Sequence, residues 1–148
     1  MKAFVVEKSE DKKFSCGIQD IPNPIIEENE VLIKTSYSSL NFKDALSSVG
    51  NPGVTRVFPH TTGIDVAGVI QQSNSSEFKE GDKVLVTGYD MGMNTNGGHS
   101  EFVKVPASWV VKMPENITDK EIMTYGTAGL TAALSVNELV NNGLTPES

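Results

Sequence analysis

The sequence predicts a mainly β protein, a small barrel or sandwich followed by a helical segment at its C-terminal end. Two observations carry this prediction. Short strand-like runs recur through the first hundred or so residues, and turn-forming Gly, Pro, Asn and Ser separate them. The last thirty residues differ, because their apolar positions recur at helical spacing.

The predicted strands are placed where β-branched residues cluster between turns. From 31 to 36, for example, β-branched side chains occupy alternate positions, as in a strand with one buried face. A short helical stretch is expected at 42–49, after the second of these strands. The predicted strands are 2–7, 31–36, 66–71, 83–87, 102–105 and 109–111.

Helical structure is also predicted for the C-terminal segment. Thr118 and Glu121 fit a capping box, with Thr118 as the N-cap and Glu121 at the third helical position. Gly126 and Gly129 interrupt the apolar pattern that follows, so we expect two helices or one helix with a break. A β-rich body ending in a lone helical segment suggests that 118–148 is a connector to something the chain lacks.

The bulk composition restricts the classes of partner. The 148 residues suffice for one domain with a hydrophobic core, and the formal net charge is −7. This charge would repel nucleic acid and acidic membrane surfaces, so neither is expected as a partner. No apolar run approaches the length of a membrane span, and the single cysteine, Cys16, excludes an internal disulfide. We therefore expect a cytoplasmic protein.

Four stretches carry a resemblance to a known family. They are 38–46 (SSLNFKDAL), 63–68 (GIDVAG), 81–90 (GDKVLVTGYD) and 126–134 (GTAGLTAAL). Each stretch is weak alone, but their order and spacing span nearly the whole chain. Together they resemble the zinc-independent quinone oxidoreductase branch of the medium-chain dehydrogenase/reductase family, and within it the subgroup that includes acrylyl-CoA reductases.

The resemblance implies a fold. Residues 1–117 would form a GroES-like, partly open β-barrel with short helices, the catalytic domain without its C-terminal return segment. Residues 118–148 would be the helical connector to a missing Rossmann domain, which would carry the glycine-rich phosphate loop. No strand followed by that glycine motif occurs in this chain.

The resemblance also implies an activity. The full-length protein would be an NADPH-dependent oxidoreductase, acting on a small-molecule substrate that is either an activated alkene, such as an acrylyl-CoA-type thioester, or a quinone. It would be a homodimer, and this portion alone would be inactive. The alternative is a GroES-like binding module without catalysis, which the helical segment at 118–143 disfavours.

Zinc is not expected as a cofactor. Alcohol dehydrogenases of the family have a cysteine at the position of Asn41 and a histidine at the position of Ile64, and a catalytic zinc needs such ligands. A single cysteine also excludes a four-cysteine structural site. His60 and His99 show no ligand spacing with Cys16, so we expect both histidines to be loop residues.

Without a metal, a reductase must polarise its acceptor with hydrogen-bond donors. Asn41 is the first catalytic candidate and would also contact the cofactor, because its amide would lie at the end of a strand facing the interdomain cleft. The alternative for Asn41 is an N-cap, and the two roles are compatible because they use different atoms of the amide. Phe42, where the family often has tyrosine, can pack against the nicotinamide but cannot donate a proton. Tyr89 is therefore a second candidate donor, and a packing residue otherwise.

Two threonines are candidates for contact with the nicotinamide carboxamide. Thr127 and Thr131 lie four residues apart on one helical face, and the resemblance places Thr127 near the nicotinamide ring. The alternative for each is a hydroxyl bonded back to its own helix. Asp44 and Asp65 are expected to be structural, and Asp65 must be hydrogen-bonded if it is buried.

Overall fold

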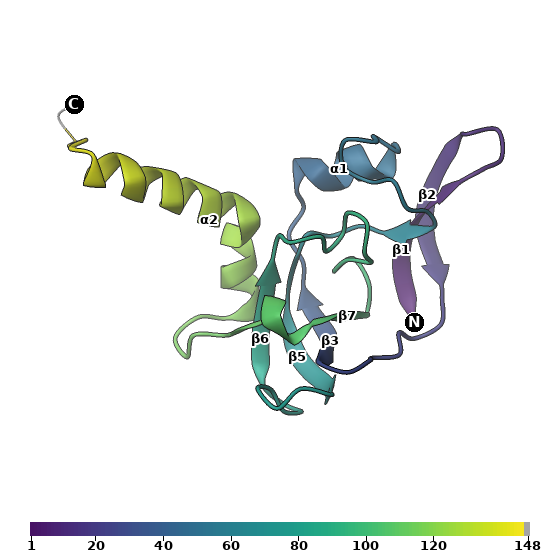
Figure 1. Ribbon diagram of the computed structural model, residues 1–148, viewed down its shortest axis with the longest axis horizontal. Coiled ribbons are helices and arrows are strands. Elements are labelled where there is room, and N and C mark those ends of the chain that lie inside the picture. The colour runs from purple at the N-terminus through teal and green to yellow at the C-terminus, as the bar shows by residue number, and fades with distance from the viewer. Residues whose placement is uncertain (147–148) are drawn as a thin grey trace.

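The computed structural model describes residues 1–146, which form two antiparallel sheets and a long helix that projects from one side (Figure 1). The smaller sheet has the order β2-β1-β4, from Phe14–Asp20, Lys2–Lys8 and His60–Thr61. The larger sheet has the order β7-β3-β5-β6-β8, from Phe102–Pro106, Glu30–Tyr37, Asp65–Ser73, Lys83–Thr87 and Val111–Lys112. The mainly β prediction is confirmed.

The larger sheet carries the hydrophobic core. Its central strands β3 and β5 pair antiparallel, with irregular register between Leu32 and Ile33 and between Thr35 and Tyr37. The inward-facing side chains of these strands and their neighbours are almost completely inaccessible to solvent, so apolar burial stabilises this sheet. The core residues include Val31, Ile33, Val66, Ile70, Val84, Val86, Met91, Val103 and Val105.

Five predicted strands agree with β1, β3, β5, β6 and β7 within two residues. The prediction at 109–111 is partly wrong, since Ala107–Trp109 is a 3-10 helix (η1) and the strand is Val111–Lys112. Strands β2 and β4 were missed. Strand β2 has exposed or half-buried residues throughout, and β4 has two residues, so neither shows an apolar pattern. Their pairing with β1 defines them.

Both helical predictions are confirmed. The short helix α1 is Phe42–Ser48 and the long helix α2 is Asp119–Asn141. At the start of α2, Thr118 Oγ1 accepts from the Glu121 amide at 3.2 Å, and Glu121 Oε2 accepts from the Thr118 amide at 2.9 Å. This reciprocal pair is the predicted capping box.

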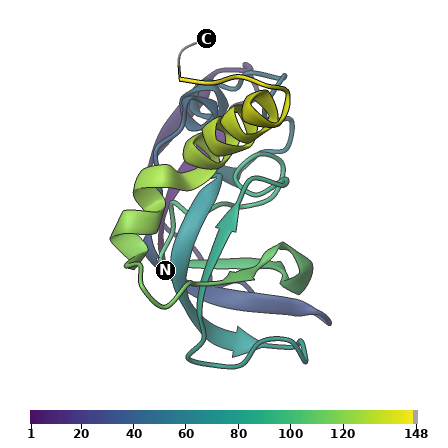
Figure 2. The same cartoon turned by 90° about the vertical axis from the view of Figure 1, so that its left-hand side faces the viewer.

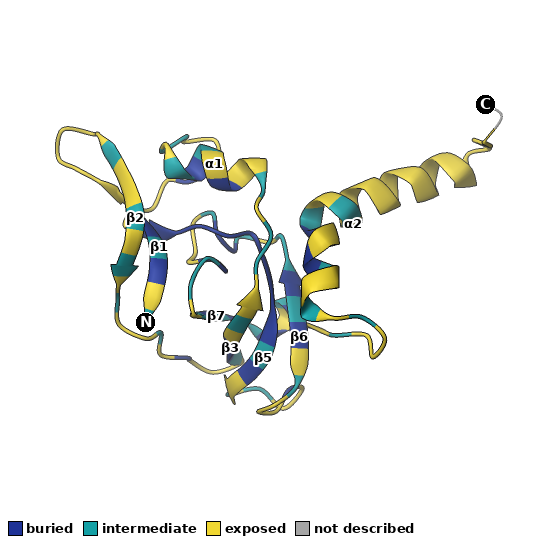
Figure 3. Cartoon of the chain, turned by 180° about the vertical axis from the view of Figure 1, so that it is seen from behind, coloured by how far each residue is buried: buried dark blue, intermediate teal, exposed yellow. Residues whose placement is uncertain are grey.

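Helix α2 changes direction at Gly126, where φ is 51° and ψ is −155° (Figure 2). Its first part packs against β5 and β3. Beyond the break the helix projects away from the sheets, and its side chains are mostly exposed (Figure 3). None of the helices in residues 1–146 is long and apolar enough to cross a membrane.

The expectation that His60 is a loop residue is wrong. His60 begins β4, is only 2% exposed, and lies edge-on to the Phe58 ring with centroids 6.3 Å apart. Within residues 1–146, neither ring nitrogen has a hydrogen-bond partner. Burial disfavours the charged imidazolium and lowers the pKa of His60 to about 4, although the nearby Gly92 backbone and, to a smaller extent, the charge of Asp90 oppose this shift.

This buried histidine predicts a loss of stability in acid. Protonation favours the unfolded chain, where the pKa is about 6.5. The stability that the folded protein gains by keeping His60 neutral is therefore complete above pH 6.5, and it is lost as the pH falls toward 4. We expect on the order of 2 kcal/mol to be lost between pH 7 and pH 4. Denaturant unfolding at several pH values measures this, and His60→Leu should remove that part of the slope. If the unfolding free energy of His60→Leu falls with pH as steeply as that of wild type, the loss comes from other groups.

Candidate active site

The carboxylate of Asp65 connects two of the predicted site residues. Asp65 is the first residue of β5 and is completely buried. Its Oδ1 accepts from the Thr127 hydroxyl at 2.6 Å, its Oδ2 accepts from the Asn41 side-chain amide at 2.8 Å, and both oxygens lie 3.0 Å from the Thr127 backbone nitrogen. The structure thus brings Asn41 and Thr127 together, and we call these three residues the Asp65 cluster.

Asn41 is the N-cap residue of helix α1 and also contacts Asp65. It has extended backbone and forms a capping box with Asp44, and its side-chain nitrogen donates to Asp65. Asp44 stabilises this helix start from the other direction. Its Oδ2 accepts from the Asn41 backbone amide at 2.7 Å and its Oδ1 from the Gly63 backbone amide at 3.0 Å. Asp44 therefore fixes the backbone from which the Asn41 amide extends.

Gly126 allows α2 to approach the buried carboxylate closely. A Cβ at this position would lie 2.5 Å from Asp65 Oδ2 and 2.7 Å from Ser39 Oγ. The Ser39 hydroxyl in turn donates to the Met123 carbonyl at 2.6 Å. Because L side chains rarely adopt the backbone conformation of Gly126, only glycine combines this break with this approach. The break positions the Thr127 amide and hydroxyl on Asp65.

None of the remaining predicted residues donates to the Asp65 carboxylate. The Thr131 hydroxyl donates back to the Thr127 carbonyl at 2.8 Å, which is the alternative considered for it. The Phe42 side chain, the first of α1, is 80% exposed. The Tyr89 ring stacks on Trp109, with centroids 5.1 Å apart and an angle of 4° between the planes. Roles for these three in catalysis or cofactor binding stay predictions.

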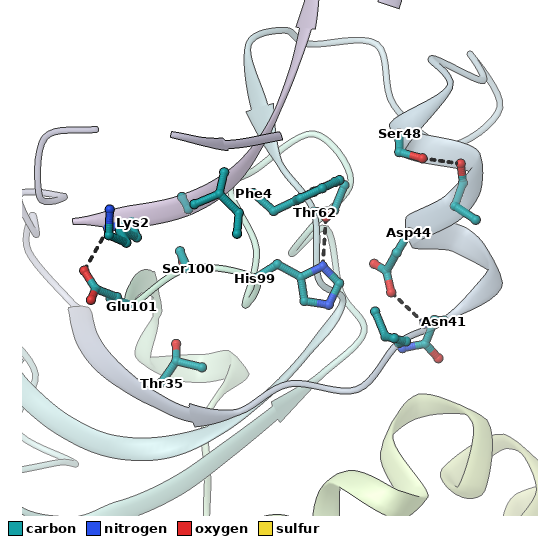
Figure 4. Close-up of a pocket in the computed structure, with 14 residues that line it drawn as sticks. Lys2, Phe4, Thr35, Asn41, Asp44, Ser48, Thr62, His99, Ser100 and Glu101 are labelled. Atoms are coloured by element: carbon teal, nitrogen blue, oxygen red, sulfur yellow. Dashed lines mark hydrogen bonds between the residues drawn. The ribbon is translucent and has the colours of Figure 1, made fainter. Parts of the chain in front are cut away.

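An open pocket of about 710 Å³ lies beside Asn41 (Figure 4). Its lining is mostly apolar and includes Phe4, Leu40 and Ala45. Of the three residues of the Asp65 cluster, Asn41 is the one that lines this pocket.

His99 holds the loop that precedes Asn41. It lies in a loop, as expected, but its ring bonds on both sides, and Figure 4 shows the bond to Thr62. Nδ1 is 2.8 Å from the Thr62 hydroxyl and Nε2 is 3.1 Å from the Ser39 carbonyl. A carbonyl can only accept, so Nε2 carries a proton and donates to Ser39. The sequence predicted only that His99 lies in a loop, and no local pattern indicated these contacts.

A catalytic zinc does not fit this site. The Asn41 amide nitrogen donates to Asp65. Ile64, the residue before Asp65, has a buried apolar side chain that is 3% exposed. Within residues 1–146 no group of three His, Cys, Asp or Glu side chains is arranged to hold a metal ion. A hydrogen-bonding role for Asn41 is better matched to these atoms than a ligand role.

Comparison with known proteins finds a family match and close structural neighbours. Residues 27–115 match the family described as "Alcohol dehydrogenase GroES-like domain". The yhdH oxidoreductase of Salmonella enterica, solved with NADP, is similar with a TM-score of 0.91 and 35% identity, over 99% of this chain and 45% of that one. The Bacillus subtilis protein yhfP, solved with NAD, gives 0.91 and 42%, over 99% and 44%.

Curated relatives have the same extent. Acrylyl-CoA reductase AcuI of Ruegeria pomeroyi is 38% identical over 97% of this chain and 44% of its own length. The curated YhfP sequence of Bacillus subtilis, whose name assigns it provisionally to the quinone oxidoreductases, is 43% identical over 99% of this chain and 44% of its own length. The chain therefore spans less than half the length of these relatives.

Proposed function

Because this chain belongs to the alcohol dehydrogenase GroES-like domain family, within the medium-chain dehydrogenase/reductases, we propose that it forms the barrel part of a zinc-independent, NADPH-dependent reductase. Residues 1–117 would be the catalytic barrel, and 118–148 would lead toward a nucleotide-binding domain. The observation that carries the proposal is the Asp65 cluster. It places two polar groups, from α2 and from the start of α1, on one buried carboxylate.

Each group has capacity left for a ligand. The Asn41 amide nitrogen has two hydrogens and uses one on Asp65, so the other can donate to an oxygen of the acceptor. Thr127 is half-buried and keeps lone pairs for the cofactor. The nicotinamide cofactor, when bound, supplies the hydride. Asn41 would then stabilise the negative charge that develops on a conjugated carbonyl oxygen.

The names of two relatives support a proposal for the substrate class. We propose an α,β-unsaturated thioester of the acrylyl-CoA type, because AcuI is matched over nearly the whole chain. A quinone is the second choice, since it also presents a conjugated carbonyl and YhfP supports it. We propose NADPH rather than NADH as the cofactor, because the neighbouring yhdH structure contains NADP.

The test is NADPH oxidation by the complete gene product that carries this chain, followed at 340 nm. Acrylyl-CoA, crotonyl-CoA and benzoquinone are offered in parallel, with the isolated 148-residue chain as the control. We expect the thioesters to be reduced fastest and the isolated chain to be inactive. If no acceptor supports NADPH oxidation by the complete product, the reductase proposal fails and a binding module replaces it.

A further inference from the structure

The proton of the Thr127 hydroxyl is committed to Asp65. Oγ1 lies 2.6 Å from Asp65 Oδ1, and the carboxylate oxygen accepts this bond. A hydroxyl has one hydrogen and two lone pairs, so Thr127 Oγ1 keeps only acceptor capacity. The Thr127 backbone N–H is committed to the same carboxylate. Toward a ligand, this residue therefore presents an acceptor and no donor.

Asp65 has the opposite effect on Asn41, because it orients the side-chain amide so that Asn41 presents a donor to a ligand. The nitrogen, and not the carbonyl oxygen, turns to the carboxylate at 2.8 Å. One N–H of Asn41 remains free to donate. A single buried anion thus gives Thr127 the character of an acceptor and orients a donor on Asn41. Bonds of this kind to a charged group are shorter and stronger than bonds between neutral groups, which makes the arrangement persistent.

Asp65 cannot touch a ligand directly, because it is completely buried beneath these two residues. The space beside the Thr127 hydroxyl is open on another side. The nearest atom that a Cβ on Gly88 would meet is Thr127 Oγ1, at 3.9 Å, and Gly88 itself has no side chain to fill that gap. Thr127 is itself only half-buried, so its hydroxyl oxygen is not enclosed by the protein.

We propose that Asp65 is a positioning residue that sets the hydrogen-bond polarity of Thr127, and that this polarity selects a ring carboxamide over a ring carboxylate. The proposal rests on the proposed function, in which Thr127 faces the nicotinamide. A carboxamide has an NH2 group that donates to Thr127 Oγ1. A carboxylate has only lone pairs, which would face the lone pairs of Thr127 and the buried charge of Asp65.

The experiment compares two nucleotides that differ only in this group. NADP+ and nicotinic acid adenine dinucleotide phosphate are titrated into the complete gene product, and the dissociation constants are measured by calorimetry. We expect wild-type protein to prefer NADP+ by about 10-fold or more, since a site built to bond one group rejects an analogue that lacks it. In Asp65→Ala, which leaves no side-chain oxygen at this position to accept the Thr127 proton, the preference should fall to about 3-fold or less.

Asp44→Ala is the matched control. Asp44 is also a buried carboxylate, 6% exposed, but it accepts from the backbone amides of Asn41 and Gly63 and not from Thr127. Its removal should leave the preference between the two nucleotides as in wild type. If Asp65→Ala does not fold, Thr127→Val removes the hydroxyl alone and should abolish the preference, whereas Thr127→Ser should keep it.

Failure of this inference is distinguishable from failure of the proposed function. Equal affinity of the wild-type protein for both nucleotides, together with NADPH-dependent reduction of an acceptor, would overturn only the role of Asp65. Full preference retained in Asp65→Ala or in Thr127→Val would overturn it as well. Binding of neither nucleotide would overturn both proposals.

Discussion

Asn41→Ala in the complete gene product is expected to lower kcat by about 10²–10³-fold, the usual effect of removing one donor that stabilises a developing oxyanion. The barrel should stay folded, because Asp65 keeps the Thr127 hydroxyl and backbone amide as partners. The lost side-chain bond should cost about 1 kcal/mol of unfolding free energy. Turnover at saturating NADPH and acceptor measures the effect.

Asn116→Ala is the control for Asn41→Ala, because Asn116 is an exposed asparagine in the loop before α2. It should leave turnover and unfolding unchanged. An Asn41→Ala enzyme with the wild-type rate would exclude Asn41 from the chemistry. If Asn41→Ala unfolds instead, the main role of the Asn41 amide is to stabilise the fold through its bond to Asp65.

Gly126→Ala is expected to lower the unfolding free energy by about 3 kcal/mol. The new Cβ would lie 2.5 Å from Asp65 Oδ2, and φ of 51° with ψ of −155° is a conformation that alanine avoids. The helix must move or straighten to relieve the clash, so the Thr127 hydroxyl should also leave Asp65. Chemical denaturation of the 148-residue chain measures the loss.

Gly81→Ala separates backbone strain from the clash. Gly81 also has positive φ, 89°, but a Cβ there would meet no atom within 4 Å. We expect it to cost about 1 kcal/mol, from the backbone conformation alone. The difference between the two variants is the contribution of close approach to Asp65 and Ser39. Equal costs would mean that the Gly126 site relaxes without disturbing the cluster.

Local patterns in the sequence predicted much of the fold. Alternation along β3 and the apolar runs of β5 and β6 reflect side chains that face the core, and the Thr118 capping box is encoded within four residues. The break at Gly126 was predicted because glycine is a poor helix former. Strand β2 was not predicted, because its residues are largely exposed and only pairing with β1 makes it a strand.

The candidate site was predicted only in part. Asn41 and Thr127 were chosen from the residues that carry the family resemblance, and the contact through Asp65 was not foreseen. Asp65 was expected to be hydrogen-bonded if buried, which the structure confirms, but its partners could not be named. Only the tertiary structure shows that the Asn41 side chain donates to Asp65 from the N-cap position of α1, and that the Thr131 hydroxyl donates to its own helix.

By itself the sequence determined the β-rich class, the capped and broken C-terminal helix, and the absence of a thiolate or imidazole at positions 41 and 64. Each depends on residue types or on spacings of a few residues, which local backbone geometry converts directly into structure. Only the tertiary structure decided which carboxylate holds the site together. Asp65 and Thr127 are 62 residues apart, and their bond exists because sheet packing and the turn at Gly126 bring β5 and α2 together.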